Sequence, residues 1–161
     1  GIVPPLDPGT SYVQVSTNAM DTSMARVGPT STYVSFAAGC AGSRPAARLV
    51  PRDTPRIDRV HEVTVFDLPQ SMALMVFGWN RTAPVSLAPF GAPGCSAHVS
   101  LNCAFLLLGQ NGQAIYRLPI PNVPALVGLH FHNQAVVFDA AAGNLAGAVV
   151  SNAAEGVIGS W

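Results

Sequence analysis

The stretch that decides the fold covers residues 118–159 and reads LPIPNVPALVGLHFHNQAVVFDAAAGNLAGAVVSNAAEGVIG. Short apolar runs in this stretch alternate with Pro-Asn and Gly-Asn turn signals, and they do not follow the 3.6-residue period of a helix. Apolar runs of this length, bounded by turn residues, are typical of strands. The stretch therefore predicts consecutive strands and an all-β domain.

The rest of the chain continues the same pattern. It holds 15 glycines and 14 prolines in 161 residues, and turn signals fall about every eight to twelve residues. The run MALMVFGW at 72–79 predicts a strand that is buried on both faces. The pair Asn111-Gly112 predicts a hairpin between strands at 104–108 and 114–120. We expect an antiparallel β-sandwich of jelly-roll type.

Composition narrows the possible partners. Apolar residues make up 49% of the chain and charged residues only 10%, the formal net charge is zero, and the basic residues are all arginine. A neutral surface favours association and lacks the positive charge with which proteins bind nucleic acid. No segment reaches the roughly 18 apolar residues of a membrane span. A chain that begins at Gly1 without a signal peptide is also expected to be a processed, secreted form.

Three cysteines leave one thiol without an intramolecular partner. Cys40 and Cys95 each follow a glycine in loop-like sequence, which favours a disulfide between them that closes a long loop. The alternative is a bond between Cys95 and Cys103, at the two ends of one strand. Cys103 lies in the apolar run CAFLLL, where a free thiol is usually buried. The spacings do not match a zinc site.

Short motifs follow one another in a fixed order along most of the chain. They are GCAGS from Gly39, a strand ending in Leu-Pro at Pro69, an apolar strand ending at Gly78, GAPGC ending at Cys95, and the final block 118–159. In this order they resemble a β-rich domain of secreted proteins from Planctomycetes and myxobacteria-like bacteria. The resemblance covers residues 36–159, and Cys103 departs from it. It implies a secreted or cell-surface β-sandwich without a known activity, ligand or cofactor.

Two histidines form the strongest metal-site pattern. His130 and His132 alternate along a strand, so both imidazoles lie on one face, as in many metal sites on β-sheets. His61 and His98 are possible further ligands. Both His130 and His132 stand where the related domain has aromatic residues, which favours packing or surface stacking. We therefore expect no metal and keep these histidines as weak candidates.

The sequence does not contain a catalytic pattern. Asp67 and Asp139 are isolated carboxylates at strand ends, whereas a glycosidase needs a pair across a cleft. A G-x-S-x-G nucleophile elbow is not found. The two aspartates are better interpreted as turn caps, and the chain is predicted not to be an enzyme.

Aromatic side chains suggest a second kind of function. A carbohydrate platform could be built from Tyr12, Tyr33, Trp79, Tyr116 and Trp161. Aromatic residues in a sandwich are more often part of the core. The alternative hypothesis is therefore a monomeric extracellular module that binds polysaccharide.

The N-terminal arm carries the main hypothesis. Residues 1–35 precede the domain 36–161, and within the arm SYVQVST at 11–17 alternates as a strand does. Residues 18–30 are expected to form a helical turn or a loop. The arm could lie along its own sandwich, or it could add a strand to another copy. Such a head-to-tail contact does not close and generates a filament.

We expect the chain to be a secreted bacterial structural protein whose partner is a further copy of itself. Strand edges without lysine are open to such pairing. The residues expected to form or dock the arm are Tyr12, Val13, Val15, Val34, Phe36 and Trp161.

Overall fold

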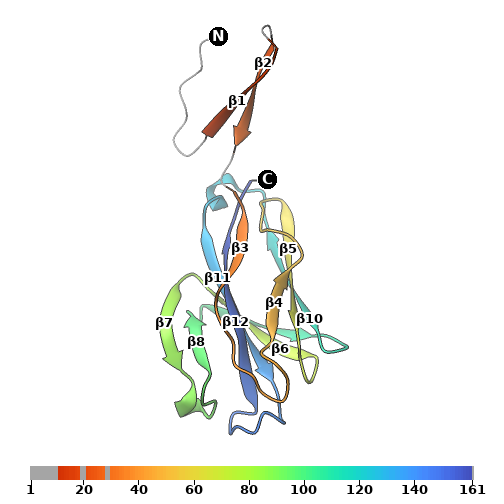
Figure 1. The fold of residues 1–161 in the computed structure, drawn as a ribbon, viewed down its shortest axis with the longest axis vertical. Coiled ribbons are helices and arrows are strands. Elements are labelled where there is room, and N and C mark those ends of the chain that lie inside the picture. The colour runs from red at the N-terminus through yellow and green to blue at the C-terminus, as the bar shows by residue number, and fades with distance from the viewer. Residues whose placement is uncertain (1–10, 19–20, 28–29, 161) are drawn as a thin grey trace.

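The computed structural model describes residues 11–18, 21–27 and 30–160, with side chains from residue 30 onward. In these ranges the chain is all-β apart from two 3-10 turns, Ala88–Phe90 and Pro124–Leu126. The ladders between its strands are antiparallel, and the two main sheets are open. This is the arrangement of a β-sandwich (Figure 1), whereas the jelly-roll detail stays a prediction. The described residues contain no helix of membrane-spanning length and apolarity.

The larger layer is a five-stranded sheet in the order β3–β12–β11–β6–β9. Its strands are β3 (Thr32–Ala37), β12 (Ala148–Val157), β11 (His130–Phe138), β6 (Met72–Gly78) and β9 (Cys103–Leu108). The long central strands β11 and β12 both come from the stretch that decides the fold, and they pair with each other. The strands predicted there are confirmed. Strands β3 and β9 are the two edges of this sheet.

The second layer is a three-stranded sheet in the order β10–β5–β4. Its strands are β10 (Ala114–Ile120), β5 (Arg59–Phe66) and β4 (Arg48–Pro51). A separate pair, β7 (Arg81–Ser86) and β8 (Ser96–Val99), lies against the outer face of the larger sheet. Gln134 on β11 holds this pair, because its amide donates to the carbonyl of Ser96 (3.0 Å) and accepts from the backbone of His98 (2.9 Å).

The core lies between the two main layers. Alternation along β5 places Val63 and Val65 inward, and alternation along β6 and β11 places Met75 and Val137 against them. All four are at most 1% exposed. Burying a side chain of this size contributes about 1.5–3 kcal/mol, so the facing valines and methionine hold the layers together.

The prediction that 72–79 is buried on both faces is wrong. On β6, Ala73, Met75 and Phe77 are buried, but the side chains between them are only half-buried. The physical reason is coverage. Strand β8 contacts β11, β12 and β6, and this partial cover leaves the outer side chains of β6 only partly buried.

The predicted hairpin after β9 forms only at its turn. Asn111 and Gly112 both have positive φ, of 54° and 76°, as the favoured two-residue hairpin turn requires. Gln110 and Gln113 pair across it. Beyond that bridge the chain passes from one layer to the other, so β9 and β10 belong to different sheets.

The N-terminal region forms its own hairpin. Strand β1 (Ser11–Asn18) confirms the predicted strand and pairs with β2 (Asp21–Val27), which replaces the predicted helical turn or loop. Within the described ranges, neither strand pairs with the sandwich. Figure 1 shows the hairpin beyond the end of the sandwich where β3 begins. Because β3 starts at Thr32, the sandwich begins before the boundary expected after residue 35.

The Cys40–Cys95 disulfide is confirmed, with Cα atoms 5.2 Å apart, and the Cys95–Cys103 alternative is wrong. Cys103 is a free and exposed thiol, not a buried one. It is exposed because β9 is an edge strand. A disulfide is compatible with an extracellular or otherwise oxidising compartment.

Candidate functional site

One candidate site is a group of side chains around Phe36, which we call the Phe36 cluster (Phe36, Arg81, His98 and His132). The guanidinium carbon of Arg81 lies 4.1 Å above the centre of the Phe36 ring. His132 and His98 meet the same ring edge-on, with centroids 5.9 and 6.4 Å away. Four strands, β3, β7, β8 and β11, therefore bring three nitrogen-bearing groups to one aromatic ring.

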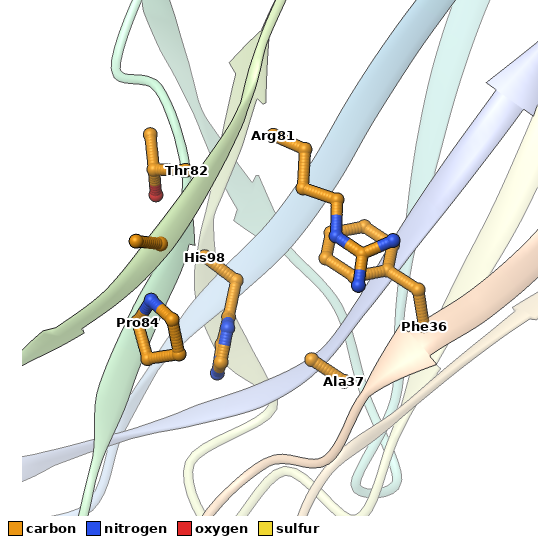
Figure 2. Close-up of a pocket in the computed structure, with 7 residues that line it drawn as sticks. Phe36, Ala37, Arg81, Thr82, Pro84 and His98 are labelled. Atoms are coloured by element: carbon orange, nitrogen blue, oxygen red, sulfur yellow. The ribbon is translucent and has the colours of Figure 1, made fainter.

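A hollow of about 500 Å³ adjoins this cluster. It is lined by Phe36, Ala37, Arg81, Thr82, Ala83, Pro84 and His98 (Figure 2). The hydroxyl oxygen of Thr82 is buried and makes no hydrogen bond with the described residues. Figure 2 shows Arg81 over the Phe36 ring, with His98 and Pro84 on the other side of the hollow. Arg81 and Thr82 are not predicted as site residues from the sequence, because side chains that meet from different strands leave no pattern along the chain.

The histidine pair of β11 meets a carboxylate. Glu155 on β12 is hydrogen-bonded to His130, and its same oxygen lies 3.7 Å from Nε2 of His132. The hydrogen bond from His130, together with the charges of His132 and Arg81, outweighs partial burial and holds the pKa of Glu155 below its ordinary value. Across the described residues, no group of three His, Cys, Asp or Glu side chains is placed to hold a metal ion.

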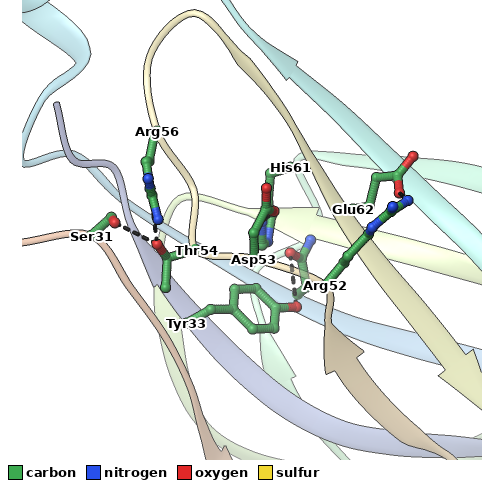
Figure 3. A network of polar contacts seen from close by, with 9 residues as sticks. Ser31, Tyr33, Arg52, Asp53, Thr54, Arg56, His61 and Glu62 are labelled. Carbon is green, nitrogen blue, oxygen red and sulfur yellow. Dashed lines mark hydrogen bonds and ion pairs between the residues drawn. The ribbon is translucent and has the colours of Figure 1, made fainter. Parts of the chain in front are cut away.

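His61 is buried in the core, away from this surface. Its ring lies 4.8 Å from that of Tyr33 and 6.0 Å from that of Phe131, and its Nδ1 is 3.7 Å from a carboxylate oxygen of Asp53 (Figure 3). Neither ring nitrogen is hydrogen-bonded to a described residue. Burial lowers the pKa of His61, and the nearby Asp53 opposes this effect only in part.

This burial predicts a pH effect on stability. Folded His61 resists protonation, whereas the unfolded chain takes up a proton near pH 6.5, so the free energy of unfolding should fall as the pH drops below that value. We expect a His61→Met variant to lose less stability than the wild type between about pH 6.5 and 5. Urea unfolding at several pH values measures the difference. Parallel profiles for the two proteins would contradict the assignment.

Of the two isolated aspartates, Asp139 accepts a hydrogen bond within its own turn, as the turn-cap interpretation predicts, whereas Asp67 forms an ion pair instead. Asp139 is 1% exposed and accepts hydrogen bonds from the backbone and hydroxyl of Ser43 and from the backbone of Ala141. Asp67 forms an exposed ion pair with Arg48 at 3.1 Å. Asp139 therefore joins two loops that are far apart in the sequence, and Asp67 contacts the neighbouring strand β4.

The aromatic platform of the alternative hypothesis is not assembled as expected. Tyr116 is 2% exposed, and Tyr33 packs against the core and bonds through its hydroxyl to Asn133 at 3.3 Å. Burial raises the pKa of both phenols. Trp79 is half exposed against Phe77, whereas the side chains of Tyr12 and Trp161 lie outside the described residues. Two of the five aromatic residues, Tyr33 and Tyr116, are therefore part of the core and cannot form a surface platform.

A second candidate site is the free edge of β9. Leu106 and Leu108 are 58% and 74% exposed, and Phe105 is 42% exposed. On the outer face, Leu106 and Leu108 stand opposite Leu74 and Met72 of β6. None of the β9 residues is charged. The apolar run in which the Cys103 thiol is expected to be buried is thus an open edge.

A hollow of about 400 Å³ lies where β9 and β10 separate. It is lined by Leu108, Gly109, Gln110, Gln113, Ala114, Ile115 and Arg117. Because the two strands belong to different sheets, their backbones do not pair beyond the turn. The sandwich is therefore open along this side.

The expected docking residues are distributed over several places. Val34 lies on the free edge of β3 and is 59% exposed, whereas Phe36 is covered by Arg81. Tyr12, Val13 and Val15 belong to β1, but their side chains are outside the described set, as is all of Trp161.

Comparison of the chain with known protein families, curated proteins and solved structures finds no match. The resemblance to the secreted bacterial domain stays a prediction. Function is therefore inferred from the fold and from the geometry of the two candidate sites.

Proposed function

We propose that the protein is a structural subunit of a secreted bacterial assembly, in which the β1–β2 hairpin of one copy pairs with the β9 edge of the next. The observation that carries this proposal is the uncharged, exposed β9 edge beside the open side of the sandwich. An edge strand of this composition is a template for pairing with another chain.

The hairpin is a suitable donor. In the described ranges its strands pair only with each other, and an isolated two-stranded hairpin is at best marginally stable in water. Adding it to a sheet satisfies one row of its backbone amides and carbonyls. The gain is shared by the edge that receives it, which has a matching unpaired row.

The β9 edge is a better acceptor than the β3 edge at the other side of the same sheet. Beside β3 lie two charged side chains, Arg81 over Phe36 and Glu155 opposite Val34. Charges next to a strand edge disfavour strand addition. Strand β9 instead presents leucines, and a leucine-rich edge gains apolar burial when a strand is added.

Pairing between a hairpin and a distant edge is a head-to-tail contact. Such contacts build open filaments unless the rotation between copies closes a ring. A formal net charge of zero allows many copies to pack without mutual repulsion.

The test compares single substitutions at the two edges of one sheet. We expect Leu106→Lys on β9 to abolish assembly, because a lysine on an edge strand disfavours the addition of another strand and removes the apolar contact that Leu106 would make. Val34→Lys on β3 is the matched control, since both side chains are more than half exposed, and it should assemble normally. Light scattering after size exclusion and electron microscopy measure assembly, and circular dichroism checks the fold.

The donor is tested separately. A chain that lacks residues 1–29 should stay folded and monomeric, and a synthetic peptide of residues 8–30 should block assembly of the full chain. Full-length protein that is monomeric at every concentration would contradict the proposal. Assembly that survives Leu106→Lys but not Val34→Lys would overturn β9 as the acceptor.

A further inference from the structure

We propose that the hollow beside Arg81 binds a small ligand through a carboxylate group. This site lies by the β7–β8 pair on the outer face of the sandwich and uses no residue of the β9 edge. It is therefore independent of self-association. Three polar groups and an apolar wall carry the inference.

Arg81 is held in position without being neutralised. Its guanidinium lies 4.1 Å over the Phe36 ring, a contact that fixes the plane of the group and leaves its N–H donors free at the rim. The described part of the chain provides no carboxylate within ion-pair distance of Arg81. A planar guanidinium fixed in this way is suited to bidentate recognition of a carboxylate.

Thr82 adds a donor that lacks a partner. Its hydroxyl oxygen is buried, and none of the described residues is hydrogen-bonded to it. A buried hydroxyl without a partner is unfavourable, so a ligand oxygen that accepts its proton would remove this penalty. Thr82 follows Arg81 directly on β7, and both residues line the hollow.

His98 completes the polar set. The backbone N–H of His98 is fixed by Gln134 at 2.9 Å, and its ring stands edge-on to Phe36. No hydrogen bond joins its side chain to another described residue, so the ring nitrogens are available to a ligand. Figure 2 shows this imidazole and the Arg81 guanidinium at opposite sides of the hollow.

The volume of the hollow and the residues that line it limit the class of ligand that it can bind. A volume of about 500 Å³ is within the usual range for small-molecule sites. Ala37, Ala83 and Pro84 form an apolar wall, which suits a compact ring or methyl group attached to the carboxylate. Both a sugar acid and the terminal residue of a peptide have this chemistry.

The negative charge of Glu155 should weaken the binding of an anionic ligand. The hydrogen bond from His130 is the main reason that the pKa of Glu155 is lowered, and the charge of Arg81 adds to this effect. A negative charge that interacts with Arg81 weakens the attraction of the site for an anion. Removing that charge should therefore strengthen binding, whereas removing the charge of Arg81 should weaken it.

The experiment uses calorimetric titration with matched probes. Methyl glucuronide and N-acetylalanine carry the carboxylate on a sugar and on a peptide, and methyl glucoside and N-acetylalanine amide are their neutral counterparts. We expect at least one acid to bind, and each neutral counterpart to bind at least tenfold more weakly, since a charge-assisted hydrogen bond contributes about 1.5–3 kcal/mol. The acid that binds more tightly shows whether the natural ligand is a sugar acid or the terminal residue of a peptide.

Variants of the full chain test each group. Arg81→Gln should weaken binding at least tenfold, and Glu155→Gln should strengthen it several-fold. Thr82→Val should weaken binding yet raise the melting temperature of the free protein, because it removes an unpaired hydroxyl. The control is Arg48→Gln, since Arg48 also lies over a phenylalanine ring, 5.7 Å above Phe66, and its loss should not change affinity.

Three outcomes would overturn the proposal. They are failure of both acids to bind, equal affinity for an acid and its neutral counterpart, and unchanged affinity in Arg81→Gln. A melting temperature that falls in Thr82→Val would contradict the role of its hydroxyl, since an unpaired group stabilises nothing.

Discussion

Replacing both Cys40 and Cys95 by alanine is expected to lower the free energy of unfolding by about 4 kcal/mol. The two cysteines are 55 residues apart, so the bond removes much of the freedom of the unfolded chain. That entropy loss is larger for long loops than for short ones. A domain with a typical stability of about 5–15 kcal/mol would lose a large share of it.

The loss should be greatest around the β7–β8 pair. The disulfide ties the segment before β8 to the loop before β4, and Gln134 provides the side-chain link from β11 to β8. Hydrogen exchange should therefore rise first in β7 and β8 when the bond is reduced.

Urea unfolding with and without reductant measures the effect of the disulfide. Cys103→Ala is the matched control, because this thiol is exposed and free, and its loss should change stability by less than about 0.5 kcal/mol. Equal stability of the oxidised and reduced wild type would show that strain in the folded state offsets the entropy effect.

Asp139→Ala is expected to lower the free energy of unfolding by at least about 3 kcal/mol, because each charge-assisted hydrogen bond that loses its acceptor contributes about 1.5–3 kcal/mol. The carboxylate accepts from the backbone N–H groups of Ser43 and Ala141 at 2.7 and 3.1 Å, and from the Ser43 hydroxyl at 2.8 Å. These contacts tie the loop after β3 to the turn after β11. Gly42 allows the approach, since a Cβ there would lie 2.3 Å from the carboxylate.

Two variants sharpen this test. Asp139→Asn keeps one acceptor oxygen and should lose about half as much stability. Asp67→Ala is the control, because its ion pair with Arg48 is exposed and contributes at most about 1 kcal/mol. Thermal and urea unfolding measure all three. Equal losses for Asp67→Ala and Asp139→Ala would contradict the role assigned to Asp139.

The Asp139 carboxylate should also make the free energy of unfolding depend on pH in acidic solution. Burial alone would raise the pKa of Asp139, but the hydrogen bonds from Ser43 and Ala141 outweigh it and hold that pKa below 3.8. Its contribution to stability is therefore present above pH 3.8 and lost as the pH falls through the lowered value. The Asp139→Asn variant should lack this acid-sensitive part.

Local sequence predicted the strands well where alternation and turn residues agree. Residues 11–17 form a strand as their alternation indicates, and Asn111-Gly112 forms its turn because both residues tolerate positive φ. These features depend only on the backbone preferences of neighbouring residues. Asp139 could also be recognised as a turn cap, because an aspartate at a strand end bonds to the nearby backbone.

Other features could not be read from neighbours along the chain. The run at 104–108 and the run at 72–79 are both apolar, yet the first is a free edge and the second is covered on one face only. Phe36 was expected to dock the arm, but Arg81 lies over it. Whether a side chain on a sheet face is exposed depends on which strand, often far away in the sequence, packs against that face.

By itself, the sequence determined that this protein is an antiparallel β-fold, and it favoured a Cys40–Cys95 bond while leaving the Cys95–Cys103 alternative open. Only the tertiary structure decided that the β9 edge is free and that Arg81 and Thr82 share a hollow with His98. The reason is physical. Strand formation and turns follow from residues a few positions apart, whereas exposure and side-chain clustering follow from contacts between strands that are far apart in the chain.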